Sequence, residues 1–315
     1  MSIDWDPQLL ALLGGIAALL LISSAIGALL HIRVQSTDGR LVVDDLNARI
    51  RAWWVITAVF CVALATGGIG SVILFALTSF IALRELITLT PTRRADHRAL
   101  FWAFFVFLPF QYYLVAIRWY GLFAIFIPVY AFLFLPLRSV LGGDTEDFLA
   151  RTAKIQWGLM IAVYCVSYAP ALLMLQVPGY EGENAKLLLY LIVVVQLSDV
   201  FQYVFGKTLG RHRIVPKVSP NKTWEGTIGG IASAILVGTL LWWATPFSPW
   251  SAAAISLIIT LAGFAGGLCM SAIKRDRGVK DFGNMIEGHG GIMDRIDSLC
   301  FAAPLFFHTV RYFYT

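Results

Sequence analysis

The chain has 315 residues, of which 58% are hydrophobic, and its mean hydropathy is +0.75. These values exclude an ordinary soluble globular protein. The net charge of +5 does not indicate a nucleic-acid partner, because the basic residues are spread over separate connections and form no stripe with exposed aromatic residues. We therefore expect a membrane protein that contacts lipids and binds no nucleic acid.

Apolar runs recur along the whole chain, and each is long enough to cross the hydrocarbon core of a bilayer. They predict an all-α, polytopic integral membrane helix bundle with about ten transmembrane helices, or about nine if the short second segment is not separate. The start of the chain is not typical of a signal peptide, because Asp4 and Asp6 stand where such a peptide has basic residues. The predicted helices are residues 8–30, 52–67, 69–88, 99–117, 120–138, 155–175, 186–206, 226–244, 251–273 and 297–313.

The positions of the basic residues predict the orientation of the bundle. Alternate connections contain clusters of Lys and Arg, whereas the others contain at most an isolated Arg118 or Lys186. Because basic loops stay in the cytoplasm, both chain ends are predicted to lie outside. We expect the inner membrane of a bacterium, with the loops of the active site on the cytoplasmic side. The basic clusters lie in residues 33–51, 93–98, 138–154, 207–222 and 274–295.

The polar residues divide one continuous membrane bundle into two parts. Residues 1–140 are predicted to be scaffold helices, because their polar residues lie at helix ends and the neighbours Arg84 and Glu85 cannot face each other on a helix. Residues 141–315 contain the polar motifs and are predicted to be the catalytic half. The segment 142–147 is expected to be a solvated surface turn.

A polar stripe interrupts the apolar run of the predicted helix 186–206. Gln196, Asp199 and Gln202 recur every three residues and therefore share one face of the helix. Asp199 lies about 12 Å along the helix from Lys207 at its end. A carboxylate at that depth is costly, so it should face a wet cavity or a cation. The alternative is a structural Asp paired with a basic residue of a neighbouring helix.

The connection that follows, residues 207–226, has the composition of an anion-binding loop. Pro216 and Pro220 prevent a helix from continuing through it. Thr223 can cap the next helix, whose N-terminal amides favour an anion. We expect ligand contacts from Ser219, Asn221, Lys222, Thr223 and Glu225. The outer basic residues Lys207, Arg211, Arg213 and Lys217 are instead expected to touch anionic lipid headgroups.

The densest polar stretch, residues 271–297, follows the predicted ninth helix. Its basic residues suit phosphate oxygens, and its glycines on both sides of His289 let the backbone approach a ligand closely. Asp294 and Asp297 are three residues apart, a spacing of hard oxygen ligands that suits Mg²⁺. The stretch therefore predicts a site for phosphate and metal. Its basic residues are Lys274, Arg275, Arg277 and Lys280.

These motifs together resemble the phosphatidate cytidylyltransferase family, the CDP-diacylglycerol synthases. The resemblance covers about residues 190–300, and the loop 217–226, KVSPNKTWEG, and Asp199 are similar to family features. The long family signature is matched by Ser271, Lys274, Arg275, Lys280, Asp281, the run 288–291 (GHGG), Asp294, Arg295 and Asp297.

The resemblance implies roles for these residues. Catalytic roles fall to Asp199, Lys222, Lys274, Arg275, Lys280, Asp281, His289, Asp294 and Asp297. Substrate-binding roles fall to Ser219, Asn221, Lys222, Thr223, Glu225, Ser271 and Arg295. The implied cofactor is Mg²⁺, with a second or monovalent ion as an option, held by Asp294 and Asp297 with Asp199 and Asp281.

The chain departs from the family pattern at three positions. Family members carry acids where this chain has Gly267 and Met270, and Pro where it has Glu287. The acid at the position of Gly267 is associated with metal binding in the family, so the chain is interpreted as a divergent member.

The implied reaction transfers the cytidylyl group of CTP to phosphatidate or a related lipid phosphate, giving CDP-diacylglycerol and pyrophosphate. Three alternatives stay open: a non-catalytic or altered-specificity paralogue that binds CDP-lipids, a CTP-dependent lipid-alcohol kinase, and a transporter. The small-residue segments 226–230 and 263–267 could pack helices within one chain or across a homodimer.

Overall fold

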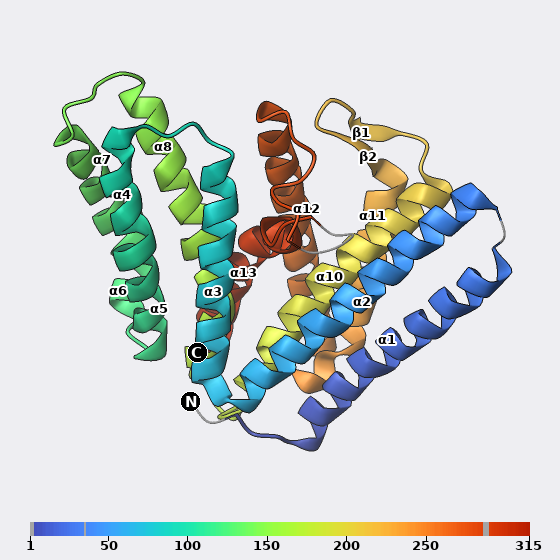
Figure 1. The fold of residues 1–315 in the computed structure, drawn as a ribbon. Helices are drawn as coiled ribbons and strands as arrows, with labels where there is room; N and C mark the ends of the chain where they lie inside the picture. The colour runs from blue at the N-terminus through green and yellow to red at the C-terminus, as the bar shows by residue number, and fades with distance from the viewer. Residues whose placement is uncertain (1–2, 35, 286–289) are drawn as a thin grey trace.

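The computed structural model describes residues 3–34, 36–285 and 290–315, and most of them are helical (Figure 1). Each of the ten predicted segments is helical, which confirms the all-α membrane bundle. In chain order the helices are α1 (Pro7–Arg33), α2 (Thr37–Ala65), α3 (Gly67–Thr88), α4 (His97–Trp102), α5 (Leu108–Ala116), α6 (Tyr120–Ile125), α7 (Phe132–Val140), α8 (Phe148–Leu159), α9 (Val166–Ala171), α10 (Asn184–Leu209), α11 (Trp224–Leu240), α12 (Pro249–Asp276) and α13 (Met293–Tyr314).

Several of the shorter helices are parts of longer ones. π-helical turns at Ala103–Phe107, Phe126–Ala131 and Met160–Cys165 join α4 to α5, α6 to α7 and α8 to α9. Within the described residues, eight helical stretches are long and apolar enough to cross a membrane. Helix α11, with 17 residues, is shorter, and α13 is outside this set. The chain is thus an integral membrane protein, while the count of about ten spans is not confirmed.

Two local predictions were wrong. Helix α2 begins at Thr37 instead of residue 52, so most of the first predicted connection is helical. Its polar first half is supported by pairs one turn apart, such as Arg49 and Asp45 at 2.9 Å. The predicted loop 207–226 contains a small antiparallel hairpin of β1 (Arg213–Val215) and β2 (Ser219–Thr223).

Glycines bring helices α10 to α13 into close contact. A Cβ on Gly226 of α11 would lie 2.7 Å from the Cα of Gly206 in α10. A Cβ on Gly266 of α12 would lie 2.6 Å from the carbonyl oxygen of Asp297 in α13. Only glycine permits these approaches. Both predicted small-residue segments therefore pack helices within one chain.

The loops gather at two opposite ends of the bundle (Figure 1). The β-hairpin, the C-terminal end of α12, the α3–α4 turn and the α7–α8 loop lie at one end, called here the signature end. Both chain termini lie toward the other end. The signature end is where the sequence motifs meet.

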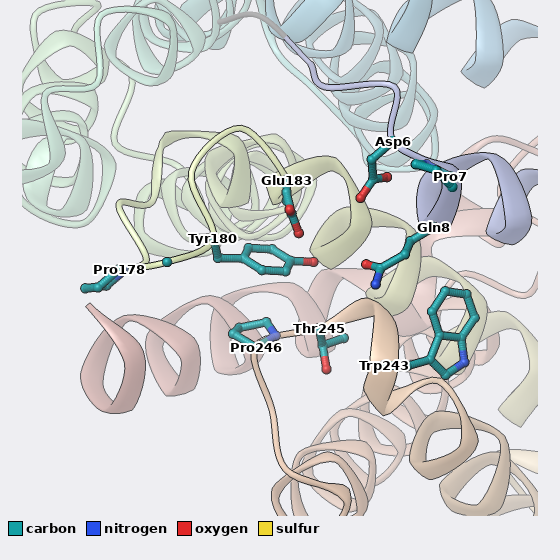
Figure 2. A pocket seen from close by; sticks show the side chains of 10 residues that line it. Asp6, Pro7, Gln8, Pro178, Tyr180, Glu183, Trp243, Thr245 and Pro246 are labelled. Atoms are coloured by element: carbon teal, nitrogen blue, oxygen red, sulfur yellow. The ribbon is translucent and has the colours of Figure 1, made fainter.

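The opposite end holds a polar cavity of about 690 Å³, shown in Figure 2 between the start of α1, residues 178–183 and residues 243–246. Its acids are already paired: the ammonium of Lys186, only 1% exposed, lies 2.5 Å from Asp6 and 2.6 Å from Glu183. The Lys186 ammonium also donates to Gln8 at 2.7 Å. This cluster docks the start of α1 onto α10.

The segment 142–147 is a surface turn as predicted, and ion pairs fix it at the signature end. Arg151 of α8 is 4% exposed and donates to the carboxylate of Asp96, just before α4, at 3.1 Å. The same guanidinium lies 3.0 Å from the Asp144 carboxylate. An exposed pair between Arg93 and Glu146 closes the network. The network joins α4 and α8 to the turn.

Candidate active site

The carboxylate of Asp294 organises the loop between α12 and α13. Its Oδ2 accepts from the backbone amides of Phe282, at 2.8 Å, and Gly291, at 2.9 Å. Its Oδ1 lies 2.8 Å from the ammonium of Lys274. With 7% of its surface exposed, Asp294 is bonded on both oxygens and fixes the two limbs of the loop to the end of α12.

Lys274 stands in the last turn of α12, where the helix dipole favours a positive charge. Its ammonium also lies 5.5 Å from the centre of the Phe282 ring. Because one side of the ammonium is held by Asp294, Lys274 is presented in a fixed position at the signature end. A fixed cation of this kind suits a phosphate oxygen.

Three charged side chains from separate elements form a second cluster: Asp199 of α10, Asp297 of α13 and Lys222 of β2. Asp199 lies close enough to Asp297, Lys222 and Arg295 for their charges to act on it. The Lys222 ammonium is placed over the ring of Phe264, 4.7 Å from its centre. Burial lowers the pKa of Lys222, and the charges of Asp199 and Asp297 oppose this shift.

Gly267 of α12 lies against the same cluster. A Cβ built on Gly267 would be 3.0 Å from the Lys222 ammonium and 3.6 Å from the hydroxyl oxygen of Ser298. The position at which the sequence departs from the family pattern therefore borders the charged cluster directly. An acid at this position would meet Lys222.

Two other predicted ligand residues of the segment 219–225, Thr223 and Glu225, make structural contacts. Thr223 caps α11 as predicted, accepting from the amide of Gly226 at 3.1 Å. Glu225 accepts from the amides of Arg211 and His212 and so ties α11 to the loop after α10. Ser219 is half-buried and Asn221 is exposed in β2.

Two of the predicted signature residues make structural contacts. Arg275 donates to the carbonyl oxygens of Val218, at 3.2 Å, and Val279, at 3.3 Å, which fastens the hairpin to the end of α12. Ser271 donates to the carbonyl of Gly267 within α12. Both side chains therefore have contacts within the protein in addition to any ligand contact.

The remaining predicted residues lie around the two clusters. Lys280 and Asp281 are exposed in the loop after α12. Arg295 is half-buried on α13, and its Nε, itself buried, has no hydrogen-bond partner in the described part of the chain. Gln196 donates to the Arg295 carbonyl at 3.3 Å. His289 and Glu287 lie outside the described residues.

The sequence analysis did not single out Glu85 of α3, which lies in the predicted scaffold half and contacts the start of α13. The two carboxylate oxygens of Glu85 accept from the amides of Ile292 and Met293, at 2.9 and 2.8 Å. The available signal was the presence of an acid inside an apolar membrane helix, which usually indicates function.

Only two of the four acids predicted as magnesium ligands are placed to bind such an ion. Among the described residues, no group of three or more His, Cys, Asp or Glu side chains could hold a metal. Mg²⁺, however, is commonly bound by one or two carboxylates together with substrate phosphates and water. Asp199 and Asp297 fit that pattern. Asp294 is engaged with the loop and Lys274. Asp281 is exposed, and its side chain lies against Gly290 of the same loop.

Two lysines held by protein contacts and a half-buried acid pair at one end of a membrane helix bundle are typical of a membrane enzyme that acts on phosphate compounds. The chain matches the model of the cytidylyltransferase family over residues 47–313, and it belongs to that family. It is therefore a nucleotidyltransferase, as the sequence predicted.

Individual relatives agree with this assignment. The chain is 40% identical to the uncharacterized protein YnbB of Escherichia coli over 94% of this chain and 96% of that protein. It is 32% identical to the phosphatidate cytidylyltransferase of Staphylococcus aureus over 78% of this chain and 92% of the enzyme. The phosphatidate cytidylyltransferase of Staphylococcus haemolyticus is 39% identical over 40% of this chain and 49% of the enzyme.

Proposed function

We propose that this protein transfers the cytidylyl group of CTP to phosphatidate or a closely related lipid phosphate. One observation carries the proposal: at the signature end of a membrane bundle, Lys222 lies within reach of the charges of Asp199 and Asp297, and Lys274 is held by Asp294. Such a site suits a triphosphate from water and a phosphate headgroup from the bilayer. The names of the Staphylococcus relatives support the same substrates.

In this reaction a phosphate oxygen of the lipid attacks the α-phosphorus of CTP. The bond from the α-phosphorus to the bridging oxygen breaks, and pyrophosphate leaves with the electron pair. Because the nucleophile is already an anion, the site needs no strong general base. It must align the two phosphates and neutralise their charge. Lys222 and Lys274 are suited to that role, since each ammonium is held in place by protein contacts.

We propose Asp199 and Asp297 as the protein ligands of a Mg²⁺ ion that arrives with CTP. When bound, this ion would neutralise charge on the phosphates of the nucleotide. Asp294 leaves the expected ligand set because both of its oxygens are bonded within the protein. Its role in the proposal is to orient Lys274.

The proposal also includes the setting of the enzyme. The inner membrane of a bacterium, with the signature end in the cytoplasm, agrees with the basic loops and with the supply of CTP. A homodimer is not needed to complete the site, because its proposed residues come from α10, β2, α12 and α13 of one chain.

The test is an assay of purified protein in detergent with CTP, Mg²⁺ and a panel of lipid phosphates, followed by mass spectrometry of the lipids. CDP-diacylglycerol formed only when phosphatidate is present supports the proposal. A CDP-lipid formed from another member of the panel identifies the preferred headgroup instead. Binding of CDP-diacylglycerol without turnover would favour the non-catalytic paralogue, for which the glycine at position 267 is the supporting observation.

A further inference from the structure

Glu85 connects the first half of the chain to the signature loop. It lies on α3, 9% exposed, and is more than 200 residues away in sequence from the amides that it binds. Its Oε1 accepts from the Ile292 amide at 2.9 Å and its Oε2 accepts from the Met293 amide at 2.8 Å. One carboxylate therefore uses both oxygens on consecutive backbone donors.

These two amides stand at the start of α13. The first amides of a helix have no partner within the helix, and the helix dipole favours an anion beside them. Glu85 supplies that anion from another helix. Because Ile292 and Met293 lie one turn before Asp297, Glu85 fixes the part of α13 from which Asp297 projects.

The glycines around Glu85 show how closely it is enclosed. A Cβ on Gly283 would lie 2.8 Å from Oε1, and a Cβ on Gly291 would lie 2.6 Å from the carboxyl carbon. Gly291 lacks the positive φ that Gly290 has at 79°. The backbone at Gly291 would thus accept alanine, and Glu85 is what excludes it.

Two carboxylates consequently hold the loop between them. Asp294 binds the amides of Phe282 and Gly291, and Glu85 binds the next two amides, those of Ile292 and Met293. The second oxygen of Asp294 holds Lys274. A contiguous set of hydrogen bonds therefore runs from α3 through the loop to a lysine of the proposed phosphate site.

We infer that Glu85 is a positioning residue: it fixes the start of α13 and, through the loop and Asp294, the location of Lys274 and Asp297 for catalysis. This inference rests on the proposed function for its kinetic part only. Glu85 itself touches no substrate in this account. Through Glu85, α3 takes part in positioning the site.

The first test is E85Q, measured by amide hydrogen exchange and by kinetics. The glutamine NH₂ group would face one of the two amides, so exchange of the segment 290–294 should become about 10-fold faster. Displacement of the site should lower kcat/KM for CTP by up to about 100-fold, while the amide left without a partner should lower the stability by about 1–3 kcal/mol. The matched control is R84Q, because Arg84 is the neighbouring, exposed residue on α3. R84Q should change none of these quantities.

The outcomes separate this inference from the proposed function. The exchange measurement needs no substrate, so its result tests the role of Glu85 even if CTP and phosphatidate are not the substrates. Unchanged exchange in E85Q would overturn the inference. Faster exchange with a wild-type kcat/KM for the enzyme's actual substrates would also overturn it, because Glu85 would then be structural only.

A second pair of variants covers the case in which E85Q does not fold. Gly291→Ala should lower kcat/KM about 100-fold, because its methyl group displaces the carboxylate of Glu85. E85D has a side chain one methylene shorter, which makes room for the new methyl group. The double variant should therefore have a kcat/KM at least about 10-fold higher than that of Gly291→Ala alone. If the fold-loss in kcat/KM of the double variant equalled the product of the two single fold-losses, the two sites would be independent and the inference would be contradicted.

Discussion

The ammonium of Lys222 lies beside the place where a side chain at Gly267 would begin, 3.0 Å from a Cβ built there. This relationship gives the departure from the family pattern a physical meaning. In this chain α12 places no carboxylate next to Lys222. The ammonium of Lys222 interacts instead with the charges of Asp199 and Asp297 and with the ring of Phe264. Lys222 is therefore available to a phosphate.

Gly267→Asp should weaken CTP binding. The new carboxylate would form an ion pair with Lys222. The Lys222 ammonium would then no longer be free to bind a phosphate of CTP. Loss of one charge-assisted hydrogen bond corresponds to about 1.5–3 kcal/mol, so the KM for CTP should rise about 10-fold or more. Gly267→Ala is the matched control, since it adds the Cβ without a charge. Higher activity in the Asp variant than in the Ala variant would contradict this interpretation.

The pKa of Lys222 predicts the alkaline limb of the pH profile. Burial lowers this pKa below that of an ordinary lysine. The ammonium is charged below its pKa and neutral above it, so kcat/KM for CTP should fall with rising pH before ordinary lysines titrate. The pH profile of kcat/KM reflects the pKa values of the free enzyme. It therefore reports the pKa of Lys222 before a bound CTP can change it. In Lys222→Arg, whose guanidinium stays charged, the alkaline fall should move to higher pH. An unchanged limb would exclude Lys222 as its source.

Asp199→Asn and Asp294→Asn should fail in different ways. Asp199→Asn removes a proposed Mg²⁺ ligand, so turnover should be lost or require far more Mg²⁺, while the temperature of unfolding stays near that of the wild type. Asp294→Asn leaves Lys274 without its partner and should destabilise the fold by about 3 kcal/mol. Titration of Mg²⁺ together with thermal unfolding separates the two. A raised Mg²⁺ requirement in Asp294→Asn without destabilisation would return Asp294 to the metal site.

The pair of Asp96 and Arg151 should matter for stability and little for catalysis. Both side chains are nearly inaccessible, so Asp96→Asn should lower the free energy of unfolding by about 3 kcal/mol. Glu146→Gln, which breaks the exposed pair with Arg93, is the control and should leave the unfolding temperature unchanged. Equal effects of the two variants would show that burial does not set the strength of this network.

The sequence predicted the parts of the fold that depend on local composition. Long apolar runs located the helices, and Thr223 was recognisable as a cap because capping needs only neighbouring residues. The start of α2 at Thr37 was missed because its first half is polar, and hydropathy finds apolar helices only. The hairpin was missed because its strands are three and five residues long and alternate weakly.

The candidate site was predictable as a set of residues but not as a geometry. The spacing of Asp294 and Asp297 indicated a shared metal, yet the loop folds back so that its own amides take Asp294. Glu85 could not be placed from its neighbours, because its partners lie at the other end of the chain. Contacts between distant segments depend on packing, which no local pattern contains.

The most direct measurement of the central claim is an assay with CTP labelled differently at its α- and γ-phosphates, Mg²⁺, the panel of lipid phosphates that includes phosphatidate, and diacylglycerol as a lipid alcohol. We predict that the α-label enters the lipid phase while an equal amount of the γ-label leaves in water as pyrophosphate. The γ-label in the lipid, with CDP released, would identify a lipid kinase and contradict the account. Neither label in any lipid of the phosphate panel, with the protein folded, would contradict it as well.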